Sequence, residues 1–317
     1  MNNELPNSNP DSQILLNQII LDYLKEKKIK RRWRWMSRFV FILIIAITAY
    51  KIYSYSKDDT GSNTKAHVGL IDINGEIADS KVASSDNFAK GMQNAYKNNG
   101  LKALVLRINS PGGSPVQAEY MYNTIKYYQA KHPDVKIYAV CVDICTSAAY
   151  YIAVAADSIY ASPSSLVGSI GVLYNGFGFV EGMEKIGVTR RLVTAGSNKG
   201  FLDPFSPITE TQKQKLQTML DIIHQQFINR VKEGRGSRLH SDADTFSGLF
   251  WTGEQALANG LIDGLGSSGQ VAREIIKIDS MIDYTQKQNF LDRVTQNIGT
   301  AMADELPLSL GIKPGLK

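Results

Sequence analysis

Histidine and cysteine, which proteins often use for metal binding and nucleophilic catalysis, are scarce in this chain. Its 317 residues include four histidines and two cysteines. The cysteines, Cys141 and Cys145, lie four positions apart in an apolar run, a spacing that fits neither a CxxC motif nor a zinc site. We expect both to be small core residues. Because no cluster of ligand residues stands out elsewhere, the sequence predicts no metal and no cofactor.

The four histidines lie where a Ser-His-Asp triad would not use them. His67 begins the first predicted strand, His132 ends a predicted helix, His224 lies within a helix and His240 lies in a polar loop. None of them follows a strand of the predicted core sheet, so we expect surface or capping roles for all four. A histidine-based triad is therefore poorly supported.

Long apolar runs are also missing, although one short run has flanks suited to a membrane. The run at 39–50 is uncharged over 12 residues, fewer than the ~20 that span a bilayer. Tryptophans before it and tyrosines after it favour the membrane interface, and Arg38 and Lys51 can reach toward the headgroups. We predict a transmembrane helix at 36–55. A cleaved signal peptide fits less well, because no suitable cleavage site follows the run; a buried core helix is the other alternative.

The positive charge of the chain is confined to one stretch. Residues 25–38 hold eight Lys or Arg and one Glu, a balance of +7, so the net charge of +5 leaves −2 for the rest. This distribution predicts no nucleic-acid partner. It marks 1–35 as a cytoplasmic basic segment, with a helix at 12–30. By the positive-inside rule, the chain then continues on the extracytoplasmic side of the cell (inner) membrane.

The remaining chain alternates short apolar runs with helical segments. This βαβ order predicts an α/β fold with a mostly parallel sheet. We predict a linker at 56–65, a domain at 66–275, and a C-terminal helix and tail at 276–317. The segments SIYASP and RRLVTAG, at 158–163 and 190–196, are predicted strands. A long helix is expected to begin at the cap Thr209, and a shorter helix at the cap Thr252.

Two glycine-containing turns carry candidate chemistry. NSPGGSP, at 109–115, ends a strand and begins a helix, and its exposed amides could form an oxyanion hole. GSIG, at 168–171, leaves the hydroxyl of Ser169 uncrowded, as a nucleophile requires. A plain structural turn would give either pattern, so neither motif is decisive alone.

A serine hydroxyl also needs a base that takes its proton. With histidine poorly placed, the candidate is Lys199 in TAGSNKGFLDPF, a small-residue loop next to apolar side chains. A lysine amine accepts a proton only when it is neutral, a state that a dry pocket favours. An exposed loop lysine is the alternative.

Four segments together resemble signal peptide peptidase A, a family of membrane-anchored Ser/Lys endopeptidases within the ClpP/crotonase-like superfamily. They are LRINSPGGSP, TSAAYYIAVAADSIYASPSSLVGSIGV, TAGSNKGFLDPF and WTGEQALANGLIDGLG, and they follow the family's order over 66–275. The length resembles the short form of the family, with one protease domain.

The resemblance implies a ClpP/crotonase-like parallel-sheet spiral that hydrolyses peptide bonds. It implies Ser169 as nucleophile, Lys199 as general base, and Gly112 and Gly113 as the oxyanion hole. It also implies remnant signal peptides as substrates and a homo-oligomeric ring at the lipid bilayer. The dyad could then form within one copy or between two.

Ser147 is the competing nucleophile. ClpP-type relatives use the serine at this place with a histidine some twenty residues further on, but here that region contains Ser169 and no histidine. We therefore expect Ser147 to cap or pack its helix. Many members read Ala-Ser-Gly-Gly-Tyr-Tyr where this chain has alanines at 148 and 149, which should tighten packing. A crotonase-type acyl-CoA enzyme and a non-catalytic membrane scaffold are the rival functions.

Overall fold

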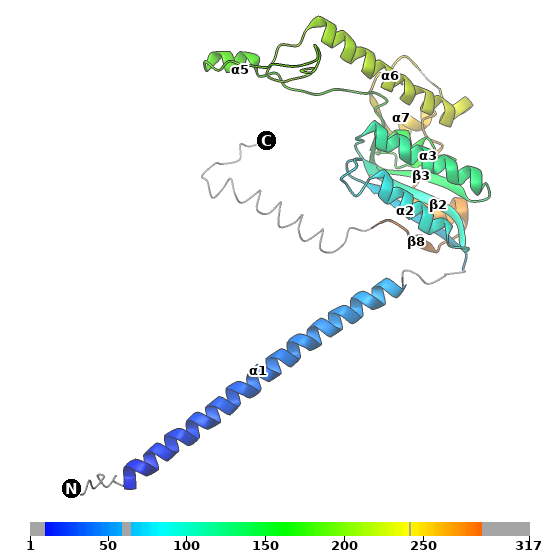
Figure 1. Cartoon of the computed structure of the whole chain (residues 1–317). Coiled ribbons are helices and arrows are strands. Elements are labelled where there is room, and N and C mark those ends of the chain that lie inside the picture. The colour runs from blue at the N-terminus through cyan, green and yellow to red at the C-terminus, as the bar shows by residue number, and fades with distance from the viewer. Residues whose placement is uncertain (1–9, 59–64, 241, 287–317) are drawn as a thin grey trace. The chain divides into compact units, whose positions relative to one another are not determined.

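A computed structural model describes residues 10–58, 65–240 and 242–286. The chain divides into two compact units, 1–62 and 63–317, and each is described here by itself. Among these described residues, the first unit contains one helix, and the second contains the sheet and the remaining helices (Figure 1).

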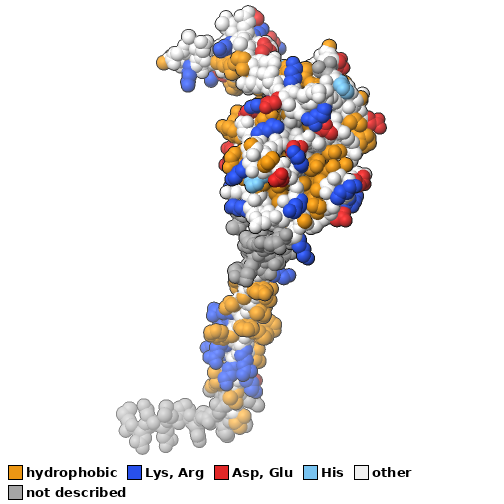
Figure 2. Space-filling model, turned by 90° about the vertical axis from the view of Figure 1, so that its right-hand side faces the viewer, with side chains coloured by type: hydrophobic (Ala, Val, Ile, Leu, Met, Phe, Trp, Pro, Cys, Tyr) orange, Lys and Arg blue, Asp and Glu red, His pale blue; other side chains and the backbone are white. Residues whose placement is uncertain are grey.

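The first unit is built around α1 (Pro10–Asp58), a single helix of 49 residues. It joins the two helices predicted at 12–30 and 36–55 without a break. Its stretch Ile20–Lys51 is long and apolar enough to cross a membrane, by length and composition. Figure 2 shows the basic side chains gathered on one stretch of this helix, with apolar side chains on either side.

The second unit is organised by an eight-stranded sheet. The strands are β1 (His67–Asn74), β2 (Leu101–Ser110), β3 (Lys136–Thr146), β4 (Ser158–Ala161), β5 (Leu166–Gly168), β6 (Phe250–Thr252), β7 (Gly264–Leu265) and β8 (Met281–Asp283). The main path runs β6-β5-β3-β2-β1-β8, with β4 and β7 branching from β3. All pairs are parallel except β5 with β6. The predicted mostly parallel α/β sheet is confirmed.

Helices connect the strands, and several begin at the caps that the sequence predicts. They are α2 (Ser85–Tyr96), α3 (Pro115–Lys131), α4 (Ala148–Ala153), α5 (Val180–Lys185), α6 (Glu210–Arg235), α7 (Gly253–Ala258) and α8 (Ser268–Gln270), with a 3-10 turn at Gly236–Arg238 and a π-helical turn at Val271–Ile276. The hydroxyls of Thr209 and Thr252 accept from the backbone amides three residues further on. In turn, the side chains of Gln212 and Gln255 accept from the backbone amides of the two threonines. These reciprocal pairs fix the starts of α6 and α7.

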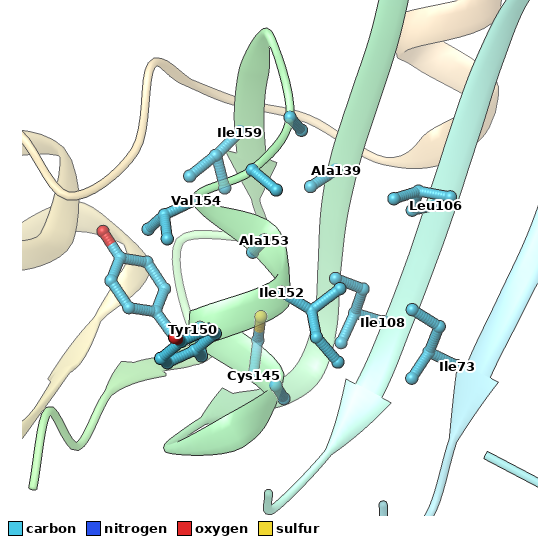
Figure 3. Close-up of a cluster of buried hydrophobic side chains, with 14 of the residues drawn as sticks. Ile73, Leu106, Ile108, Ala139, Cys145, Tyr150, Ile152, Ala153, Val154 and Ile159 are labelled. Carbon is cyan, nitrogen blue, oxygen red and sulfur yellow. The ribbon is translucent and has the colours of Figure 1, made fainter. Parts of the chain in front are cut away.

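The core lies between α4 and the sheet. All six residues of α4 are buried, and the alanines at 148 and 149 let the helix approach β2 and β3 closely. Figure 3 shows Ile152 beside Ile108, with Cys145 below the helix. Tyr150 is fully buried, and its hydroxyl donates to the Leu261 carbonyl at 2.6 Å. Both cysteines are buried and free, as predicted.

Two expectations from the sequence are wrong, and a third falls mostly outside the described residues. RRLVTAG forms no strand, because this segment is exposed and has no neighbouring strand to pair with. His67 is buried rather than superficial, and its ring nitrogens lie 2.9 Å from the Lys65 carbonyl and the Tyr284 hydroxyl. The predicted C-terminal helix lies mostly outside the described residues; before it, β8 pairs with β1.

Candidate active site

An open pocket of about 1150 Å³ lies where three parallel strands end. Gly113 follows β2, Ser147 follows β3 and Ser169 follows β5, and all three residues line the pocket. Side chains from α3 and α6 complete the walls. Ligands in α/β sheets bind beyond the carboxyl ends of the strands, so this is the candidate site.

Ser147 lies on a sharp turn between β3 and α4. Its backbone is strained, with φ 55° and ψ −127°, and its side chain makes no capping bond to the helix. A strand-turn-helix with a strained serine is the arrangement that exposes the nucleophile in α/β-hydrolases. The Ser147 amide donates to the Gly168 carbonyl at 2.8 Å, which holds this turn against the end of β5.

The Pro-Gly-Gly turn passes directly beside Ser147. A Cβ on Gly112 would lie 2.7 Å from the Cβ of Ser147, so only glycine permits this approach. The Gly112 amide donates to the Ser110 hydroxyl at 3.1 Å and is therefore occupied. Gly113 has φ +145°, and a Cβ there would collide with the Ile77 carbonyl. In the part of the chain that the structure describes, the amides of Gly113 and Ala148 have no acceptor.

Ser169 lies on the same pocket but in a different setting. It has φ 51°, follows the short strand β5 and precedes no helix. Its amide donates to the Leu249 carbonyl and its carbonyl accepts from the Gly171 amide, at 2.8 and 2.9 Å. Ser169 and Gly113 thus line the same pocket.

Lys199 is exposed and is not among the residues that line the pocket. It belongs to a segment that stands clear of the sheet in Figure 1, between β5 and α6. Between residues 173 and 199, all residues except Val180 and Met183 are exposed. Within the described chain, no lysine or histidine lines the pocket.

His224 is the histidine nearest to the GSIG segment. Its Nε2 lies 3.0 Å from the Ile170 carbonyl, and because a carbonyl only accepts, Nε2 carries the proton. This bond ties α6 to the residue after Ser169. His132 caps α3, and His240 lies 3.1 Å from the Ala258 carbonyl.

Sequence reasoning missed an ion pair on the pocket wall. Glu119 of α3 and Arg230 of α6 both line the pocket and bond at 2.7 Å across 111 positions of sequence. Burial raises the pKa of Glu119, but hydrogen bonds from Arg230, Tyr151 and Asn123 outweigh it, so the pKa lies below its ordinary value. No local sequence motif indicates a contact between residues so far apart in the chain.

Metal binding has no support among the residues described. In 10–58, 65–240 and 242–286, no group of three or more His, Cys, Asp or Glu side chains could hold an ion. The described residues that line the pocket offer three serines, backbone amides and one ion pair.

Family comparisons place this arrangement in a known class. Residues 66–167 match the Clp protease family. Residues 129–281 match peptidase family S49. A putative protease of Synechocystis is 30% identical over 209 residues, covering 65% of this chain and 72% of its own. The chain belongs to peptidase family S49, and its resemblance to signal peptide peptidase A is confirmed.

Other relatives differ in overall length. A putative signal peptide peptidase of Enterococcus faecium is 27% identical, covering 72% of this chain and 67% of its own. A Na(+)/H(+) antiporter NhaA of Brucella melitensis is 47% identical over 55% of this chain, and this chain spans only 24% of the antiporter's length. A solved membrane-bound stomatin-specific protease is 18% identical, with a TM-score of 0.46 over 74% of this chain and 98% of its own.

Proposed function

We propose that this chain is a serine endopeptidase whose nucleophile is Ser147. The strained turn between β3 and α4 supports this role, because it presents the hydroxyl beside a glycine that leaves room for it. Ser169 remains the nucleophile predicted from the sequence. The geometry favours Ser147, since Ser169 follows a short strand and precedes no helix.

The oxyanion hole consists of the Gly113 and Ala148 amides. Neither amide has an acceptor among the described residues, and Ala148 is the residue directly after the proposed nucleophile and begins α4. An amide in that position stabilises the tetrahedral intermediate in enzymes with this turn. Gly112 serves a steric role instead, because its amide already donates to Ser110.

The general base is Lys199 of an adjoining copy. Among the described residues, the one basic side chain that lines the pocket is Arg230, and its guanidinium is already protonated and cannot accept a proton. Lys199 lies on an exposed segment rich in apolar side chains, among them Phe177, Ile186 and Val193. A second copy would cover these side chains and bring the amine into a drier site. Head-to-tail contacts of this kind form a ring when the rotation between copies closes.

The reaction is amide hydrolysis. Ser147 Oγ bonds to a peptide carbonyl carbon while the neutral Lys199 amine takes its proton. The C–N bond then breaks, and the lysine returns the proton to the leaving amine. The same lysine deprotonates a water molecule that attacks the acyl ester, releasing the carboxylic acid and restoring Ser147.

The substrates we propose are apolar peptides at a membrane, such as remnant signal peptides. The pocket walls carry Val116, Tyr120, Tyr151 and Phe227, which suit apolar side chains. α1 anchors the chain, with the basic stretch at 25–38 in the cytoplasm and the sheet unit on the extracytoplasmic side. The relative in Enterococcus faecium carries the name of a putative signal peptide peptidase.

Four variants of the full chain in detergent test this function with a fluorogenic apolar peptide. We expect Ser147→Ala and Lys199→Ala to lose more than about 1000-fold in kcat, because each removes a member of the dyad. The control Ser247→Ala, on the pocket rim, should retain activity. Ser169→Ala should retain measurable turnover; total loss there with full activity of Ser147→Ala would overturn the assignment. Thioester turnover without peptidase activity would favour the acyl-CoA alternative.

A further inference from the structure

Glu119 and Arg230 are the charged residues among the described residues that line the pocket. They form a two-point contact: Arg230 Nη2 lies 2.7 Å from Glu119 Oε1, and Nε lies 3.4 Å from Oε2. Their side chains are 33% and 31% exposed, so each charge is mostly removed from water yet faces the pocket. The pocket therefore holds one charge of each sign, and they cancel.

The carboxylate of Glu119 has no free acceptor position. Besides Arg230, it accepts from Asn123 Nδ2 at 3.1 Å and from the Tyr151 hydroxyl. Both oxygens thus carry two bonds each, which is about all that a carboxylate accepts. A cationic substrate side chain would find this acid already occupied.

The guanidinium of Arg230 is held almost as completely. Its Nη1 donates to Glu233 Oε2 at 3.0 Å, and its centre lies 4.5 Å from the ring centroid of Tyr122. The remaining N–H groups belong to a charge that Glu119 balances within the pocket, because Glu233 does not line the pocket and its side chain is 56% exposed. An acidic substrate side chain would lose its hydrating water there and gain little interaction energy in return.

The pair lies close to the proposed nucleophile. Tyr151, which donates to Glu119, follows Ser147 by one helical turn, and its amide donates to the Ser147 carbonyl at 3.0 Å. Its ring also packs against Phe227 of α6, with centroids 5.1 Å apart. A substrate side chain next to the scissile bond would therefore pass this wall.

We propose that the Glu119–Arg230 pair is a specificity determinant that restricts one subsite to uncharged side chains. The proposal rests on the peptidase function given above. Each charge, if left alone, would attract substrates of the opposite sign; paired, the two residues reject both signs, because a charged side chain loses water and gains no partner.

The test uses the full-length protein and peptides that differ from one uncharged parent by a single Lys or Glu. The charge is placed in turn at each of the three positions on either side of the scissile bond. At one position, the wild type should disfavour both charges in kcat/KM. Glu119→Gln should improve the Glu peptide about tenfold relative to the parent, and Arg230→Met should improve the Lys peptide about tenfold, because each leaves one charge unbalanced.

The double variant separates charge from structure. Glu119→Gln with Arg230→Met lacks the ion pair but is neutral again, so it should return to the wild-type preference for the uncharged peptide. If the ion pair matters only for folding, the double variant should be at least as impaired as either single variant. Equal losses toward all peptides, with no dependence on the sign of charge, would overturn the proposal.

A binding measurement distinguishes this failure from failure of the proposed function. The same peptides are titrated against Ser147→Ala, alone and combined with Glu119→Gln or Arg230→Met, and Kd is measured by fluorescence anisotropy. If the wild type cleaves none of the peptides but Kd follows the predicted charge pattern, the specificity role stands and the peptidase function falls. If Kd shows no such pattern, the specificity role falls even where cleavage is found.

Discussion

Ser147 and Ser169 both have positive φ, 55° and 51°, next to one pocket. Non-glycine residues in such conformations cost about 1–3 kcal/mol each and persist where surrounding contacts impose them. At Ser147 those contacts are the bond from its amide to the Gly168 carbonyl and the start of α4. The strain is therefore consistent with an arrangement kept for function.

Gly113 provides the clearest single-residue prediction. A Cβ at this position would collide with the Ile77 carbonyl, so Gly113→Ala should destabilise the protein by about 2 kcal/mol or more and sharply lower peptide hydrolysis. Gly266→Ala is the matched control, because a Cβ there meets only the Gln270 side chain, at an ordinary 3.8 Å. The free energy of unfolding from urea titration and kcat/KM test both effects. Wild-type values for Gly113→Ala would contradict the described turn.

At the residue scale, the sequence located two of its predicted site residues on one pocket, and their roles stay predictions. The Pro-Gly-Gly turn and GSIG were found because glycine marks turns locally, and Gly113 and Ser169 do line one pocket. The special geometry of Ser147 could not be read, because a serine before a helix also fits a cap. The bond between Gly112 and Ser110, and the pair of Glu119 with Arg230, depend on tertiary contacts.

At the element scale, a buried ion pair joins the end of α6 to β4 and β7. Arg235, whose side chain is 1% exposed, binds both oxygens of Asp263 at 2.8 Å and donates to the Gly260 carbonyl. Asp263 also accepts from the Ile159 amide of β4 at 2.7 Å. Removing one partner would leave the other charge buried and uncompensated.

We expect Asp263→Asn to destabilise the protein by about 3 kcal/mol, in the range for a broken buried pair. The measurement is the urea midpoint of the full chain in detergent. Glu210→Gln breaks the exposed pair with Lys213 and serves as the control; it should change stability by less than about 0.5 kcal/mol. Equal effects of the two variants would contradict the structural role of Asp263.

The same carboxylate gives a pH prediction. Burial raises the pKa of Asp263, but bonds from Arg235 and the Ile159 amide, with the charges of Arg235 and Arg238, outweigh it and lower the pKa. Its stabilisation is therefore complete above the unfolded value of about 3.9 and is lost as pH falls through the lower folded value. The stability gap between wild type and Asp263→Asn should be constant from about pH 7 to 5 and narrow below about pH 4.

Elements with strong local signals were predictable. Capping residues and apolar spacing gave α6 and α7, and buried apolar runs gave β1, β2 and β3. RRLVTAG has strand-like composition but no partner strand in one chain, so composition alone misassigned it. The three-residue strand β8 has too short a pattern to be recognised from sequence.

At the scale of the whole molecule, the exposed segment between β5 and α6 leaves apolar side chains and Lys199 uncovered. If the dyad forms between copies, Ser147→Ala and Lys199→Ala should complement each other. Subunits of the two inactive proteins, mixed under conditions that allow exchange, should regain activity, because some sites then combine an intact serine with an intact lysine. No recovery despite exchange would indicate a dyad within one copy.

The sequence predicted the two-part plan of an apolar helix and an α/β unit because hydropathy and βαβ order are local patterns. It could not choose between a dyad within one chain and a dyad between chains, since thirty positions between Ser169 and Lys199 permit both. The exposure of Lys199 in one chain now favours the arrangement between copies.

The most direct test is to locate the reactive serine chemically. A fluorophosphonate probe is incubated with the full-length oligomer, and the modified residue is identified by peptide mass spectrometry. The account predicts a phosphonyl adduct on Ser147 that disappears in Lys199→Ala and persists in Ser169→Ala. An adduct on Ser169 with Ser147 unmodified would contradict it.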